Sequence, residues 1–173
     1  TLFEAILLVI LVVFIFLQSF RSTIIPTISI IVSLVGTFAF LMVAGFSLNM
    51  ITLFALVLVI GTVVDDSIVV VEAVQAKFDA GYRSPYKATV DAMGGITSAL
   101  VATTFVFMAV FIPVSFMGGT TGTFYTQFGL TMAVAVGISL LNSLTTSPAL
   151  CALIMTPHAD VSSGEKASFS TRF

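Results

Sequence analysis

Long apolar runs separated by short polar connections make up most of this chain. A helix that spans a membrane needs about 20 mostly apolar residues. Five runs reach that length, and they predict helices over roughly residues 2–20, 24–45, 49–76, 95–117 and 124–155. We therefore expect an all-α membrane protein, a bundle of five transmembrane helices.

The connection before the fourth run carries helix signals of its own. Ser84 followed by Pro85 has the form of a helix N-cap with proline at the first helical position. The apolar residues that follow at helical spacing are Tyr86, Val90 and Met93. The pattern predicts a short surface helix over about residues 84–93, ended by Gly94-Gly95.

Composition supports the membrane class and excludes others. Hydrophobic residues make up 58% of the 173 residues and charged residues only 8%, against roughly a quarter charged in soluble domains. The net charge of -2 and the lack of a basic stripe argue against nucleic-acid binding. Cys151 is the single cysteine, so the chain can build neither a disulfide nor a cysteine-based metal site. No signal-peptide pattern precedes the first run, so we expect an internal piece of a longer protein.

The basic residues choose a side of the membrane. They lie in alternate connections and in the C-terminal tail, and they are Arg21, Lys77, Arg83, Lys87, Lys166 and Arg172. Because cytoplasmic loops carry an excess of Lys and Arg, we expect a periplasmic N-terminus and a cytoplasmic C-terminus. The segment over residues 158–173, which begins with His158, is expected to be a polar cytoplasmic tail.

Two adjacent acids, Asp65 and Asp66, lie within about 5 Å of the centre of the third run at 1.5 Å per residue. An ionised carboxylate at that depth is unfavourable by about 2.5–3.5 kcal/mol on insertion scales, and such residues typically line a proton or ion path. Burial and a neighbouring carboxylate both disfavour the charged form, so the two acids should titrate as a coupled pair. We expect this acid pair to carry protons, with no other cofactor and no metal.

The acid pair lacks a counter-charge in this sequence. A cation that approached and left the pair would switch its proton affinity, but Arg21 and Lys77 lie at the cytoplasmic ends of their runs. The counter-charge is therefore expected on helices outside this chain. Glu72, seven residues beyond Asp65, and Thr62 are candidates for an accessory proton path; alternatively, Glu72 is an interfacial acid in contact with water.

Small residues repeat at intervals of four on two of the runs, as they do in close helix contacts within membranes. They are Gly129, Ala133 and Gly137 on the fifth run, and Ser29, Ser33 and Thr37 on the second. These residues indicate helix packing rather than catalysis.

The stretch from Gly61 to Glu72, which contains the acid pair, resembles the fourth-helix motif of resistance-nodulation-division (RND) efflux pumps, the AcrB-like drug exporters. Further stretches that resemble the family in the same order are 16–27, 36–38, 45–49, 117–122, 125–128 and 147–152. The similarity covers residues 1 to about 157. Ala73 and Ser147 depart mildly from the family pattern and leave the proton role intact.

The resemblance implies helices two to six of a twelve-helix protomer in the bacterial inner membrane. It implies that the paired aspartates exchange protons opposite a Lys and an Arg on helices of the second half. A homotrimer that works with a periplasmic adaptor and an outer-membrane channel is implied as well. Metal-exporting relatives usually keep one acid here, so the double Asp favours drugs or other amphiphiles as cargo. The fragment alone is not expected to transport, because the first helix, the periplasmic regions and the second half are absent.

Three other classes stay open at this point. A truncated half could act as a non-transporting scaffold or partner of full-length pumps, with membrane lipid around it. An intramembrane aspartyl protease also uses two membrane aspartates, but it needs them on different helices that face one water. A soluble buried helix with a structural acid pair is disfavoured by the low polar content.

Overall fold

Five helices account for nearly all of the described chain. The computed structural model describes residues 2–119 and 121–157. The helices are α1 (Leu2–Leu17), α2 (Phe20–Val43), α3 (Met50–Asp79), α4 (Pro85–Val114) and α5 (Gly122–Ile154), and the described residues contain no strand. This confirms the predicted all-α class. The predicted tail over residues 158–173, with His158, lies outside the described residues.

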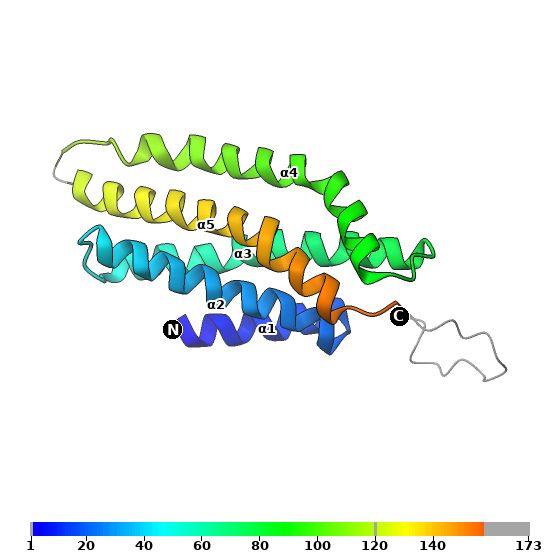
Figure 1. Ribbon diagram of the computed structural model, residues 1–173. Helices are drawn as coiled ribbons and strands as arrows, with labels where there is room; N and C mark the ends of the chain where they lie inside the picture. The colour runs from blue at the N-terminus through cyan, green and yellow to red at the C-terminus, as the bar shows by residue number, and fades with distance from the viewer. Residues whose placement is uncertain (1, 120, 158–173) are drawn as a thin grey trace.

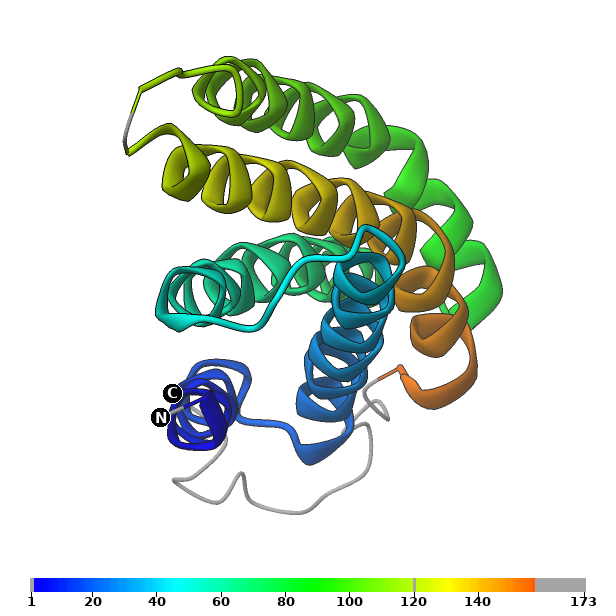
Figure 2. The ribbon, with the colours of Figure 1, turned by 90° about the vertical axis from the view of Figure 1, so that its left-hand side faces the viewer.

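The helices lie side by side and alternate in direction (Figure 1). The α1–α2 and α3–α4 connections and the end of α5 lie at one end of the bundle, and the α2–α3 and α4–α5 loops lie at the other. Viewed along the bundle, α5 lies between α4 and α3 (Figure 2). Helix α5 packs against α2, α3 and α4, while α1 packs against α2 and α3.

The first helix is shorter than the sequence pattern predicted. Helix α1 has 16 residues, or about 24 Å at 1.5 Å per residue, against a hydrocarbon thickness of about 30 Å. It ends where Gln18 adopts a φ of 47°, a left-handed conformation that interrupts helical hydrogen bonding. The described residues therefore contain four helices of spanning length and composition, α2 to α5, rather than five.

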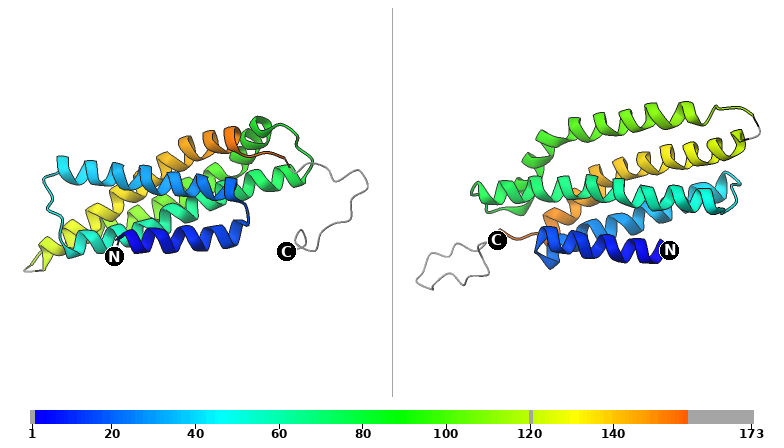
Figure 3. Two further views of the ribbon diagram at one scale, coloured as in Figure 1. Left: turned by 90° about the horizontal axis from the view of Figure 1, so that it is seen from below. Right: turned by 180° about the vertical axis from the view of Figure 1, so that it is seen from behind.

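A single helix, α4, replaces the predicted surface helix over residues 84–93 and the predicted span over 95–117. Ser84 caps it as expected, because its side chain accepts from the Lys87 backbone N–H and Pro85 follows. Gly94 and Gly95 do not end the helix, since glycine costs about 1 kcal/mol in a helix but keeps its N–H donor. The helix instead bends between a short first segment and a long second one (Figures 1 and 3), as helices do at glycine pairs.

The third helix begins at a well-formed cap. The Asn49 side chain accepts from the backbone of Ile51 and Thr52, and the Thr52 hydroxyl accepts in return from the Asn49 N–H, which makes a capping box. The Asn49 amide also donates to the Gln127 side chain at 2.5 Å, which ties the start of α3 to α5. This end fixes the register of α3 in the bundle, and with it the position of the acid pair.

Candidate functional site

The acid pair lies at the middle of α3. Asp65 and Asp66 are the sixteenth and seventeenth of the 30 residues of this helix. Successive residues on a helix point about 100° apart, and the structure places the two carboxyl groups in different surroundings. Asp65 is exposed and Asp66 is partly buried.

Asp65 lies on a face of α3 that no other described helix covers. The exposed residues at helical spacing on this face, called the open face below, are Met50, Phe54, Leu58, Gly61, Asp65, Val69 and Glu72. Phe54 is 61% exposed, and a Cβ placed on Gly61 would meet no atom within 4 Å. An ionised acid facing hydrocarbon is costly, so this face is poorly suited to contact with lipid.

The opposite face of α3 is fully packed. The buried residues at helical spacing on this covered face are Thr52, Leu56, Val59, Val63, Ser67, Val70 and Val74. The five apolar residues among them belong to two apolar clusters that also contain residues of α2, α4 and α5. Helix α3 therefore has one face that is packed against other helices and one face that is not. The acid pair lies at the boundary between these two faces.

Asp66 has a specific partner on α5. The Ser139 hydroxyl donates to Asp66 Oδ2 at 2.7 Å, a distance typical of a charge-assisted or strong hydroxyl hydrogen bond. Ser139 is itself fully buried. Ser139 is not among the residues predicted from the sequence. The signal for it is the repeat of Ser139, Ser143 and Ser147 at intervals of four.

The two candidates for an accessory path differ in their setting. The Thr62 hydroxyl donates to Val59 O at 2.9 Å within its own helix. Glu72 is exposed and lies seven residues beyond Asp65 on the open face, about 10 Å along the axis. That separation is too long for a direct hydrogen bond, so any link between Glu72 and the acid pair needs an intermediate.

Helices α2 and α5 meet through the small residues that the sequence singled out on α2. Ser29 and Ser33 are both fully buried. The hydroxyl groups of Ser29 and Ser147 lie 3.0 Å apart, and the Asn142 amide donates to Ser29 O at 3.1 Å and to Ser33 Oγ at 3.3 Å. Polar contacts of this kind join helices in apolar surroundings.

The small residues on α5 lie against α4. A Cβ on Gly129 would come within 2.8 Å of Phe111 O and 2.7 Å of Ser115 Oγ, so this position has no room for a side chain. A Cβ on Gly137 would meet only the end of the flexible Met108 side chain, at 2.9 Å. Ala133 is buried as well. Close approach of the two helices therefore depends most on Gly129.

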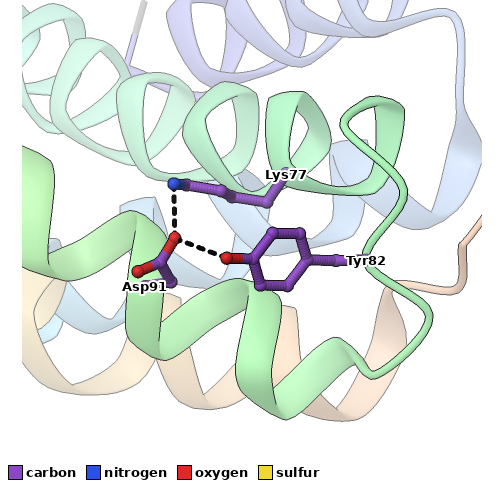
Figure 4. Close-up of polar contacts among 3 residues, drawn as sticks. All are labelled: Lys77, Tyr82 and Asp91. Carbon is purple, nitrogen blue, oxygen red and sulfur yellow. Dashed lines mark hydrogen bonds and ion pairs between the residues drawn. The ribbon is translucent and has the colours of Figure 1, made fainter.

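A second polar cluster lies at the far end of α3 (Figure 4). Lys77 pairs with Asp91 of α4, and Tyr82 donates its hydroxyl proton to the same carboxylate at 3.0 Å. The Lys77 ammonium also lies 5.7 Å from the centre of the Tyr82 ring. Lys77 is twelve residues from Asp65, or about 18 Å along the helix, so it cannot serve as the counter-charge of the acid pair.

Comparison with known proteins identifies the family. The sequence profile described as the AcrB/AcrD/AcrF family matches residues 1–173. The chain belongs to this family of RND multidrug efflux transporters. It is 46% identical over 177 residues to the multidrug export protein AcrF of Escherichia coli K12, across 100% of the chain and 17% of AcrF.

Two further relatives have the same relation to the chain. It is 48% identical over 157 residues to the toluene efflux pump membrane transporter TtgB of Pseudomonas putida DOT-T1E, across 91% of the chain and 15% of TtgB. It is 48% identical over 155 residues to the multidrug resistance protein MdtF of E. coli K12, across 90% of the chain and 15% of MdtF. The chain thus spans about a sixth of the length of these relatives, which are transporters rather than enzymes. Transporters of this family are inner-membrane proteins, in keeping with the apolar helices.

Proposed function

We propose that this chain is the proton-coupling part of a proton-driven RND efflux pump, in which Asp65 and Asp66 bind and release protons. The observation that carries the proposal is the position of Asp65 on the open face, halfway along a spanning helix. A carboxyl group there is tolerated when it faces protein or water rather than lipid. The open face is therefore the docking surface for the other half of the transporter, and that half supplies the cation.

The charges of the described chain fit this arrangement. Arg21, Lys77, Arg83 and Lys87 lie in or beside the connections at one end of the bundle (Figure 1). That end is the cytoplasmic one by the distribution of basic residues, which puts the N-terminus in the periplasm. Within the described residues, no Lys or Arg lies near the middle of α2 to α5, and we assign the cation to helices outside this chain.

We infer the cargo class from the names of the relatives and the assembly from the family resemblance. Their names describe multidrug export, toluene efflux and multidrug resistance, and we assign drugs and other amphiphiles as the cargo class here. The assembled pump is a homotrimer with a periplasmic adaptor and an outer-membrane channel. Protons are the coupling ion, and no other cofactor takes part.

The test is a chimera in which this chain replaces the matching segment of AcrF. Asp65→Asn and Asp66→Asn remove the titratable groups with little change in shape, and each is expected to abolish export of a fluorescent drug under a proton gradient. Asp79→Asn, at the exposed end of α3, is the matched control and should retain export. If both acid-pair variants export normally, the proton role is wrong.

A second experiment tests the missing half. The chain alone, reconstituted in vesicles with an imposed pH gradient, is expected to give no proton-driven drug flux. A robust flux would contradict the requirement for an external cation. Association of this chain with a full-length pump, without any proton-dependent signal in the chimera, would instead support the scaffold role.

A further inference from the structure

A polar layer separates the two apolar clusters of the core. One cluster takes Ile30 of α2, Val64 of α3 and Ala135 of α5, and the other takes Ile25, Val70 and Leu140 from the same three helices. The polar residues that lie between the clusters along these helices are Ser29, Asp66, Ser67 and Ser139. Asn142 lies just beyond Ser139 on α5 and joins them through its hydrogen bond to Ser29 O. This layer is at the depth of the acid pair, on the covered side of α3.

Most hydrogen-bonding groups in the polar layer have partners. Ser139 donates its proton to Asp66, and the Asn142 amide nitrogen donates to α2 at Ser29 and Ser33. Among the described residues, two buried side-chain oxygens have no partner, Asn142 Oδ1 and Ser67 Oγ. Asn142 is 4% exposed and Ser67 is 0% exposed. The unmatched groups therefore lie in one layer, beside the acid pair.

Turning the Asn142 amide over does not solve the problem. The carbonyl oxygen would then face Ser29 O, and two acceptors would oppose each other. A buried polar group left unpaired costs about 1–3 kcal/mol, and the hydrocarbon around the bundle offers no donor. The present orientation needs a donor for Asn142 Oδ1 and a partner for the Ser67 hydroxyl.

Ser67 Oγ lies on α3 and Asn142 Oδ1 lies on α5, and these two helices are in contact. Ser67 follows Asp66, whose carboxylate meets Ser139, and Asn142 is three residues beyond Ser139 on the same side of α5. Water has two donors and two acceptor sites, and buried waters typically make about three hydrogen bonds to such groups. We propose that the polar layer is a water-binding site, in which an ordered water donates to Asn142 Oδ1 and bonds to Ser67 Oγ.

This site has a consequence for Asp66 that goes beyond the proposed function. A water held by Ser67 and Asn142 would lie on the covered side of α3, next to Asp66 in the chain, whereas the external cation approaches from the open side. Asp66 then has a proton-exchange partner, the bound water, that is held by residues of this chain. The water site itself depends only on α2, α3 and α5, so it is testable whether or not the chain transports.

The chain offers well-placed reporters. It contains two asparagines, Asn49 and Asn142, and one cysteine, Cys151. Asn49 caps α3 at the end of the bundle, where we expect contact with water, and serves as the hydrated reference. Cys151 is fully buried in an apolar cluster and serves as the dry reference. With isotope-labelled Asn and Cys in the full chain, in lipid bilayers, solid-state NMR measures the transfer of water magnetisation to each side chain.

We expect transfer to the Asn142 side chain at a rate comparable to that for Asn49, with none to Cys151. Transfer to Asn142 as slow as that to Cys151 would show a dry layer and overturn the site. Equal transfer to all three would show water throughout the bundle and would also overturn it.

A pair of serine substitutions tests the bridge. Ser67→Ala removes one of the two proposed partners and is expected to reduce the transfer to Asn142, while Cys151 stays dry and thereby reports an intact bundle. Ser98→Ala, at an exposed position of α4, is the matched control and should change nothing. Undiminished transfer to Asn142 in the Ser67→Ala chain would exclude Ser67 as a ligand of the water.

Discussion

The two faces of α3 differ in packing: one is buried against other helices and the other is exposed. On the covered face, seven residues at helical spacing are buried against α2, α4 and α5. On the open face, the residues at the same spacing are exposed, and they include Asp65 and Gly61. Both faces are mostly apolar, so hydrophobicity alone does not distinguish a contact with lipid from a contact with protein.

The acid decides how the open face should be understood. An apolar helix face can remain in contact with lipid at no cost, as we expect for much of α4 and its exposed Phe105 and Val110. A face with a carboxyl group at its centre cannot. The glycine one turn before Asp65 strengthens the argument, because a small residue lets another backbone approach closely.

The largest effect is expected from filling the space at Gly61. In the chimera with AcrF, Gly61→Leu should abolish export or lower it about tenfold or more, since overpacking a helix contact costs about 1–3 kcal/mol. The isolated chain should fold normally, because no atom lies within 4 Å of the added Cβ. Drug export and the circular dichroism of the chain are the two measurements.

Ala109→Leu is the control for that prediction. Ala109 is exposed on α4, in a region without a buried charge, and the variant should export normally. Normal export by Gly61→Leu would mean that lipid, rather than a helix, covers the open face.

The next largest effect is expected on the stability of the contact between α5 and α4. Gly129→Ala should lower the free energy of unfolding by about 1–3 kcal/mol, because the new methyl group meets the Phe111 carbonyl and cannot displace it. Gly137→Ala is the matched variant and should cost less, since the flexible Met108 side chain can move away. Unfolding in mixed micelles measures both, and equal losses would show that the α4–α5 contact does not depend on Gly129.

A smaller effect is expected from the partner of Asp66. Ser139→Ala removes one hydrogen bond on the covered side and should cost about 1 kcal/mol of stability. Combining it with Asp66→Asn should cost less than the sum of the two single changes, as a double-mutant cycle detects for groups in contact. Combining Ser139→Ala with Asp65→Asn should be additive, because Asp65 lies on the other face. Coupling to Asp65 instead of Asp66 would reverse the assignment of the two acids.

Sequence patterns predicted the helices better than their ends. Apolar run length located all five helices, because the hydrophobic pattern dominates in this chain. Local backbone features set the limits: the left-handed Gln18 shortens α1, and Gly94-Gly95 bends α4 without ending it. Such features depend on packing at the ends of the bundle, which a run of apolar residues does not encode.

The site was predictable only in part, for a similar reason. Acidic residues are rare in an apolar run, so the sequence alone predicts Asp65 and Asp66 as site residues. Ser139 and Asn142 did not, since isolated polar residues are common in membrane helices and only the fold brings them beside Asp66 and Ser29. The difference between the two acids is likewise a property of the assembled bundle.

The smallest effect is expected at the cytoplasmic end, beyond both faces. Asp91→Asn breaks the pair with Lys77. Because both side chains are in contact with solvent, with 50% and 35% of their surface exposed, the midpoint of thermal unfolding should fall only slightly. The difference from the unmodified chain should vanish at about 1 M salt, where the screening length is about 3 Å. A large loss of stability that persists in salt would mean that this cluster, rather than the Gly129 contact, holds α4 on the bundle. In that case the contacts at the cytoplasmic end would hold α4 in place, and Gly129→Ala should leave the midpoint of thermal unfolding almost unchanged.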